Sequence, residues 1–165
     1  MIVAQTIGLI AMAMGWWANS RQSDQQLLRA NSVAALLTAL HFGLMGSPLG
    51  MSNQLVNAGR FALSQHARHW LLPLGFAALA LLQGILLANH WSEWLVVSAA
   101  VISSFLLFYA HGWRLRLGLL LCAALNLTLS LYLWSYSGII YQTVNASMLI
   151  NSLWQSRNSP AFAVD

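Results

Sequence analysis

The 165-residue chain is 59% hydrophobic and only 6% charged, whereas soluble domains carry about 25% charged residues. So few charges cannot cover the surface of a soluble fold, which excludes that class and indicates an integral membrane protein surrounded by the lipid bilayer. Seven arginines, three acidic residues and no lysine give a net charge of +4, too few and too scattered for a nucleic-acid interface.

Apolar runs of roughly the length of a membrane span recur along the chain, since a spanning helix needs about 20 largely apolar residues. The first run has no basic residue before it and is followed by Arg21 and Arg29. A cleaved signal peptide has the reverse order, so we expect this run to stay as the first span. The sequence predicts an all-α integral membrane protein, a single membrane domain with seven transmembrane helices. These helices are expected at 2–18, 27–45, 48–65, 70–89, 91–110, 114–134 and 137–155.

Charged residues are distributed unevenly over the two sides that these spans define. All seven arginines fall on one side or in the adjoining half of a span, whereas Glu93 and His90 lie at the edge of the other side. By the positive-inside rule the arginine side is cytoplasmic. This places the N-terminus outside and a tail of residues 156–165 inside. All eight tryptophans fall near predicted span ends, the depth that amphipathic rings prefer.

Two segments of the chain match each other at an offset of 88 residues. Six of twelve positions in 47–58 are identical to their counterparts in 135–146, where background usage would give roughly one. The pattern predicts two three-helix repeats joined by a linker helix. With an odd number of spans between them, the repeats would be parallel, related by an axis along the membrane normal. The predicted parts are repeat one at 2–65, the linker at 70–89 and repeat two at 91–155.

The run from His41 to Gly46, followed by Asn57-Ala58-Gly59-Arg60, resembles the YgjV family of bacterial inner-membrane proteins. The match consists of a His-Phe pair, a glycine turn and an Asn-Ala-x-Arg sequence in the next helix. The resemblance implies residence in the bacterial inner membrane, and it implies no activity because members of the family generally lack an assigned one. The 3+1+3 layout is also similar in architecture to the SWEET and PQ-loop transporters. The prolines that hinge SWEET helices are missing here.

Amide side chains recur in the third helix of each predicted repeat. Asn57 and Asn145 fall about halfway along these helices, and Gln54 and Gln142 lie one turn outward. Amides offer donors and acceptors without the desolvation cost of a charge, which suits a neutral polar solute. They equally suit hydrogen bonds between helices, so both interpretations stay open. SWEET proteins use an asparagine in the third helix of each unit at the sugar site, and this resemblance favours solute binding.

Three further residues are candidates for gating or for structural roles. Arg60, one turn after Asn57, could extend to the inner headgroups or contact an anion at an inner gate. His41, near the outer end of the second span, could be a proton-linked or gating group, or could hydrogen-bond a neighbouring helix. Glu93, near the outer mouth, is its expected acidic partner.

Enzyme motifs are missing from the sequence: it has no Gly-x-Ser-x-Gly elbow, no HExxH, no P-loop and no carboxylate pair within a span. We therefore expect no catalytic residue, no metal site and no cofactor. The leading hypothesis is a facilitative transporter that binds a small polar solute between Asn57 and Asn145. The alternatives are a non-transporting scaffold or accessory subunit, and a lipid-modifying membrane enzyme that uses His41 and Arg60. The sequence does not indicate an oligomeric state.

Overall fold

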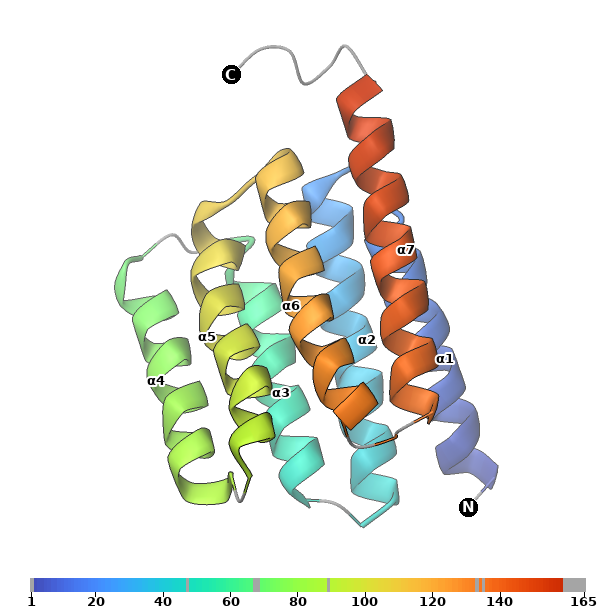
Figure 1. The fold of residues 1–165 in the computed structure, drawn as a ribbon, viewed down its shortest axis with the longest axis vertical. Coiled ribbons are helices and arrows are strands. Elements are labelled where there is room, and N and C mark those ends of the chain that lie inside the picture. The colour runs from blue at the N-terminus through green and yellow to red at the C-terminus, as the bar shows by residue number, and fades with distance from the viewer. Residues whose placement is uncertain are drawn as a thin grey trace. The chain divides into compact units, whose positions relative to one another are not determined.

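The computed structural model confirms an all-α fold. It describes residues 2–46, 48–66, 69–88, 90–132, 134 and 136–158, and these form seven α-helices, one short 3-10 helix and no β-strand (Figure 1). Every helix begins and ends within three residues of its predicted span. The elements are α1 (Ile2–Asn19), α2 (Asp24–Leu44), α3 (Pro48–Leu63), α4 (Leu71–Leu87), η1 (Trp91–Glu93), α5 (Trp94–Tyr109), α6 (Gly112–Tyr132) and α7 (Tyr136–Asn158).

Some of the predictions fall outside the described residues. These are Ser47 and Ser135 of the matching segments, Arg68 on the arginine side, and 159–165 of the tail.

Four helical segments of the described chain are long and apolar enough to cross a membrane: α1, α2, η1 with α5, and α6. Helix α4 is apolar but shorter, at 17 residues. Helices α3, with 16 residues, and α7, with 23, are not among these four, and α7 is long but carries many polar side chains. The two most polar helices are therefore those that carry the predicted solute-binding amides. Polar residues in membrane helices face the protein interior or a water-filled cavity.

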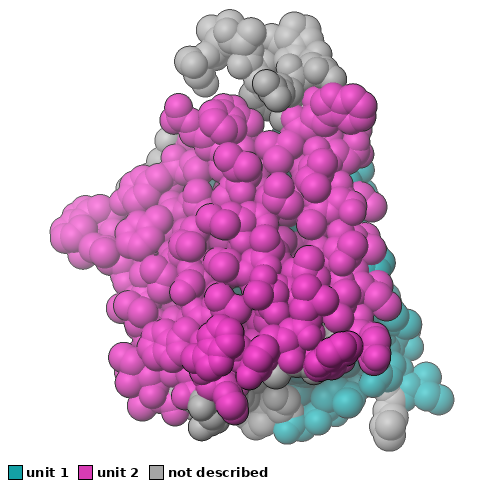
Figure 2. Space-filling view, in the orientation of Figure 1, with its two compact units in different colours: residues 1–67 teal, residues 68–165 magenta. Residues whose placement is uncertain are grey.

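The chain divides into two compact units, residues 1–67 and residues 68–165, called unit 1 and unit 2 below (Figure 2). Unit 1 contains α1, α2 and α3, with α1 packed on α2 and α2 packed on α3. Unit 2 contains α4 to α7, and each of its helices packs on the next in chain order. Helix α4, the predicted linker, thus packs on α5.

The helices of unit 1 approach each other through small residues. Helix α1 buries Ala4, Ala11 and Ala18, and α2 buries Ala34 and Ala35 among others. Small residues let helix backbones approach closely, and dispersion contacts then stabilise the pair in lipid, where the hydrophobic effect gives little. Large apolar side chains lie on the outside of both units, as expected of surfaces covered by lipid.

The helix bounds of the two units correspond at the offset of 88 residues. Helix α6 begins and ends 88 residues after α2, and α7 begins 88 residues after α3. The turns before α3 and α7 each contain a residue with positive φ at corresponding positions, Gly46 at 73° and Trp134 at 52°. Burial corresponds as well, in the pairs Ala11 and Ala99, Leu27 and Leu115, Ala35 and Ala123, and Ser64 and Ser152. The parallel arrangement of the repeats stays a prediction.

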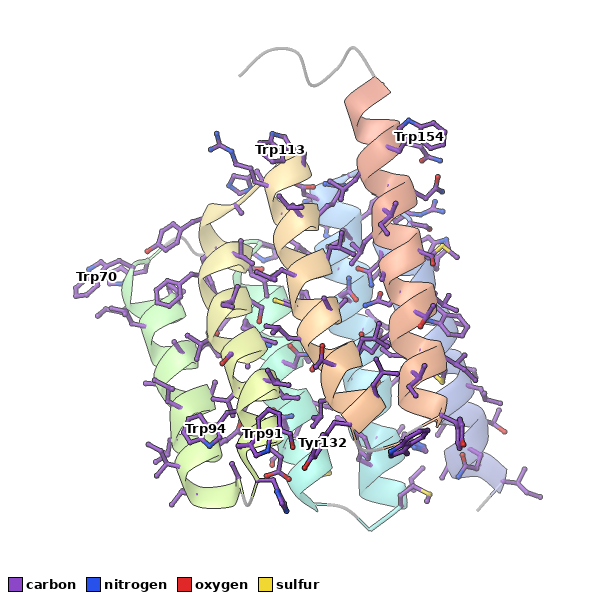
Figure 3. The ribbon with its side chains drawn as sticks, in the orientation of Figure 1. Trp70, Trp91, Trp94, Trp113, Tyr132 and Trp154 are labelled. Atoms are coloured by element: carbon purple, nitrogen blue, oxygen red, sulfur yellow. The ribbon has the colours of Figure 1, made fainter. Side chains whose placement is uncertain are left out.

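Aromatic side chains of unit 2 gather at the two ends of its helices (Figure 3). Trp91, Trp94 and Tyr132 lie at one end, where the rings of Trp91 and Tyr132 meet edge to face with centroids 5.4 Å apart. Trp70, Trp113 and Trp154 lie at the other end. Tryptophan and tyrosine belts of this kind mark the two membrane–water interfaces. This arrangement indicates that unit 2 reaches from one interface to the other.

Candidate functional site

The amides predicted on the third helix of unit 1 form one row with Arg60. Gln54, Asn57 and Arg60 are spaced three residues apart along α3, so they share a face. Arg60 Nη2 donates a hydrogen bond to Asn57 Oδ1, and Asn57 Nδ2 donates one to Gln54 Oε1 at 3.5 Å. All three side chains are partly buried. The contact between the two amides is long and therefore weak, so a ligand could replace it at little cost.

Arg60 points back along its helix. Its guanidinium reaches Asn57, which precedes it by one turn, instead of extending beyond the end of α3 at Leu63. A side chain that serves only to reach the headgroups would extend the other way, toward the nearer membrane surface. The observed contact places the Arg60 side chain on the polar face of α3, and neither the headgroup contact nor the anion contact is tested by it.

The corresponding amides of unit 2 lie on α7. Gln142 and Asn145 are partly buried and one turn apart. The side-chain oxygen of Gln142 is buried and accepts no hydrogen bond from the part of the chain that the structure describes. A buried acceptor without a partner costs about 1–3 kcal/mol, and few are found in native proteins. Gln142 therefore presents an acceptor suited to a donor from outside the chain.

His41 ties α2 to α1 within unit 1. Its Nδ1 lies 2.7 Å from the carbonyl oxygen of Ala4, and because a carbonyl can only accept, Nδ1 carries the hydrogen. Gly8 provides the space for the imidazole, since a Cβ at this position would lie 3.0 Å from His41 Nδ1. This contact is the one expected if His41 hydrogen-bonds a neighbouring helix. It occupies one ring nitrogen and leaves the other for a second partner.

The structure does not bring His41 and Arg60 together. His41 lies near the end of α2 and Arg60 near the end of α3, and these two consecutive helices run in opposite directions. Gly43 approaches Met51 across the hairpin, and Ser32 Oγ donates to the carbonyl of Ala58 at 3.1 Å. These two contacts fix how α2 and α3 are aligned along their length. At 1.5 Å of rise per residue, this alignment leaves His41 and Arg60 roughly 10–15 Å apart along the helix axis.

Glu93, the expected partner of His41, lies in unit 2 and caps a helix. Its Oε2 accepts a hydrogen bond from the backbone N–H of His90 at 3.3 Å, at the start of η1. Such a contact satisfies a backbone donor that the first turn of a helix would otherwise leave unpaired. Among the described residues, no group of three or more His, Cys, Asp or Glu side chains is placed to hold a metal ion.

Arg116, near the start of α6, is fully buried, which we did not expect from the sequence. Its Nε donates to Ser152 Oγ at 2.9 Å, and its Nη1 donates to the carbonyl oxygen of Gly112 at 2.9 Å. Ser152 lies on α7 and is also fully buried, so the guanidinium links two helices of unit 2. One signal could have revealed this residue. Arg114 and Arg116 point about 200° apart on a helix, so if one of them faces outward from the bundle, the other faces the neighbouring helices.

Within each unit the described arginines lie at one end. In unit 1, Arg21 follows α1, with its guanidinium 4.6 Å from the Trp17 ring centroid. Arg29 lies near the start of α2, and its Nε donates to Gln65 Oε1, just past the end of α3, at 3.3 Å. In unit 2, Arg114 lies over the ring of Trp113 at the start of α6. Arginine beside tryptophan is expected at a membrane interface.

Comparison with known proteins agrees with this architecture. The family model Imp-YgjV, described as a bacterial inner membrane protein, matches residues 2–159. No curated protein and no solved structure matches the chain. The matched segment includes all seven helices, both polar faces among them, and the apolar helices suit the location that the family description gives. The chain therefore belongs to the Imp-YgjV family of bacterial inner membrane proteins.

Proposed function

We propose that the chain is a non-enzymatic transporter that carries a small polar solute across the bacterial inner membrane. The observation that carries this proposal is the side chain of Gln142, whose buried oxygen has no hydrogen-bond partner among the described residues. A hydroxyl or N–H group of a solute would satisfy that oxygen. In this proposal the amides of α3 and α7 are the solute-binding groups of their units.

The polarity of α3 and α7 supports the same proposal. These two helices begin at corresponding positions and each carries glutamine and asparagine one turn apart. Polar residues in membrane spans are expensive and commonly mark the pathways of solutes and ions. In unit 1 the amides sit in a row that ends at Arg60, and the long contact between Gln54 and Asn57 is one that a solute could replace.

Gln142→Leu tests the proposal directly. The leucine removes the unsatisfied acceptor, so the stability should stay unchanged or rise, by up to about 1–3 kcal/mol. Solute uptake should fall to background, because the solute loses its acceptor. The measurements are thermal unfolding in detergent, and uptake of labelled polyols, sugars and amino acids into proteoliposomes. Gln155→Leu, an exposed change on the same helix, should leave uptake intact. A lower melting temperature with unchanged uptake would make Gln142 a structural residue.

A second candidate function, a non-transporting scaffold or accessory subunit, is favoured by the contacts of unit 1. There Asn57 bonds to both of its neighbours in the row, and His41 bonds to Ala4 of the adjacent helix. Polar side chains often do no more than join membrane helices. This function predicts that changes to the amides lower stability and that the purified protein moves no solute.

The arginine distribution leads to a separate prediction, which concerns the orientation of the chain in the membrane. A reporter fused after Asp165 should be active in the cytoplasm, and Ile2→Cys should react with a membrane-impermeant thiol reagent from outside. The native Cys122 is buried, so Cys122→Ala gives a matched background free of other thiols. A C-terminus outside the cytoplasm would contradict the predicted topology, and the predicted parallel arrangement of the repeats would then be wrong as well.

A further inference from the structure

The two ends of unit 2 carry similar aromatic side chains but opposite charges. Trp91 and Trp94 lie at one end, with Glu93 between them in the sequence, whereas Trp113 lies at the other end, directly before Arg114 (Figure 3). Glu93 is the one acidic residue of the sequence between positions 68 and 158. In the described part of unit 2, the end with Trp113 therefore carries positive charge without a carboxylate to neutralise it.

Each tryptophan at the positive end of unit 2 has an arginine within three residues in the sequence. The pairs are Arg68 and Trp70, Trp113 and Arg114, and Trp154 and Arg157. The tryptophans toward the other end, Trp91, Trp94 and Trp134, have no arginine within that distance. Tryptophan by itself suits either membrane interface, so the arginines are what distinguishes this end. Among these three arginines, the structure describes the side chain of Arg114.

The guanidinium of Arg114 is available for an external partner. The residue is exposed, and its guanidinium lies 5.7 Å from the ring centroid of Trp113, which is itself 53% exposed. A contact between a cation and a ring is electrostatic, and no described residue accepts a hydrogen bond from this guanidinium. Arg116 differs, because it is buried and donates to Ser152. Arg114 thus presents unused N–H donors beside an exposed indole.

The start of α4, at the same end of unit 2, offers a second aromatic ring with a donor beside it. His69 and Trp70 are both exposed, and their rings stack with centroids 6.3 Å apart. His69 Nδ1 accepts the backbone N–H of Leu71 at 3.4 Å. The hydrogen of a neutral imidazole is then on Nε2, which can donate to a further partner.

We infer that this end of unit 2 binds the headgroups of anionic phospholipids, of the class of phosphatidylglycerol. The guanidinium of Arg114 matches two oxygens of the lipid phosphodiester, and the indole N–H of Trp113 can donate to an ester oxygen of the same lipid. The exposed tryptophans favour a lipid over a soluble phosphate, because they prefer the depth of the headgroups.

The absence of a described carboxylate at this end selects among lipids. Phosphatidylcholine and phosphatidylethanolamine carry an ammonium group next to the phosphate, and this group would lie near Arg114 without an acidic residue to receive it. Phosphatidylglycerol carries hydroxyls there instead, so its negative charge is not neutralised within the lipid. The inference concerns a lipid partner and does not depend on which solute, if any, is transported.

Thermal unfolding of the purified full-length chain in a neutral detergent provides the first test. Phosphatidylglycerol should raise the melting temperature more than the same amount of phosphatidylcholine. Added NaCl should reduce this difference, because salt screens charges at exposed sites. Inorganic phosphate should give no shift. In native mass spectrometry, the chain should keep bound phosphatidylglycerol at lipid concentrations that leave no bound phosphatidylcholine.

Variants at the two ends of unit 2 provide the second test. Arg114→Gln should keep its melting temperature without lipid, because Arg114 is exposed. Its affinity for phosphatidylglycerol should fall about fivefold, as expected for one basic residue near an anionic surface. Arg114→Lys keeps the charge and should bind better than Arg114→Gln. Trp113→Leu should also weaken binding, whereas Trp94→Leu, the matched change at the other end, should leave it intact.

Three results would overturn the inference. Equal stabilisation by phosphatidylglycerol and phosphatidylcholine would mean that the lipid charge is not recognised. An equal shift with inorganic phosphate would indicate a site for soluble anions. Unchanged affinity for phosphatidylglycerol in folded Arg114→Gln would remove Arg114 from the contact. The comparisons of lipids and salt use the unaltered chain, so they remain decisive if a variant does not fold.

Discussion

Gly118→Leu should destabilise the protein by about 1–3 kcal/mol or more, the cost of overfilling a packed interior. Gly118 is buried on α6 and faces Leu106 of α5. A Cβ at this position would lie 2.2 Å from Leu106 Cδ1 and 2.9 Å from its Cγ. Since Cγ is close to the backbone, rotating the end of Leu106 cannot clear the overlap, and the helices have to separate. Thermal unfolding in detergent measures the effect.

The corresponding residues of unit 1 show another pair of side chains that fits this helix contact. Its residues at the corresponding positions are Ala18 and Ala30, both buried, where unit 2 has Leu106 and Gly118. The double variant Leu106→Ala, Gly118→Ala reproduces the alanine pair and should be more stable than Gly118→Leu. Gly75→Leu on α4 is the control, because nothing lies within 4 Å of a Cβ built there. A stable Gly118→Leu would contradict the close approach of α5 and α6.

The number and bounds of the helices could be predicted because they depend on local signals. Apolar runs long enough to cross the membrane predict where the helices lie, and turn-forming residues predict where they end. Gly46 adopts a positive φ directly before α3, which begins at Pro48, and proline suits the first turn of a helix because its missing N–H would be unpaired there. Before α7, the corresponding residue is Trp134, which also has a positive φ. A bulky residue at positive φ is uncommon, so this turn carried no such signal in the sequence.

The inward faces of the helices could not be predicted in the same way. Helices α2 and α6 have apolar residues on every side, so their sequence gives the depth of a residue in the membrane but not its direction around the axis. Arg116 is the clearest example. Its place near a span end predicted only the side of the membrane on which it lies, and the structure shows the side chain in the interface with α7. Only the packing of neighbouring helices decides this direction.

The candidate site was predicted as far as residue types and their spacing allow. The one-turn spacing of Gln54 and Asn57, and of Gln142 and Asn145, predicted that each pair shares one helix face, and each pair lies within a single helix of the structure. Their bonding differs, however. In unit 1 the amides bond in a row, whereas the oxygen of Gln142 has no partner in the described part of the chain. This difference depends on side-chain rotamers and on neighbours from other helices, which the sequence of one helix does not contain.

Gly8→Leu should destabilise unit 1 through His41, again by about 1–3 kcal/mol. A Cβ at Gly8 would meet the imidazole at 3.0–3.3 Å from three of its atoms, and a larger side chain would displace the ring from the Ala4 carbonyl. In a His41→Ala background the same substitution has room, so the two changes should cost less together than the sum of their separate effects. Gly59→Leu is the control within unit 1, because a Cβ there meets nothing within 4 Å. Additive effects would contradict the contact.

The same variants decide what His41 does. A hydrogen bond between membrane helices contributes about 0.6 kcal/mol on average and about 1.7 kcal/mol at most, so His41→Ala should leave a folded protein in which uptake can be measured. If His41 only joins α2 to α1, as its bond to Ala4 indicates, uptake by this variant should keep its rate and its dependence on pH. Uptake that is lost, or that no longer responds to pH at normal stability, would make His41 a proton-linked group. The bond to Ala4 would then serve to orient the ring, because it holds the imidazole against α1.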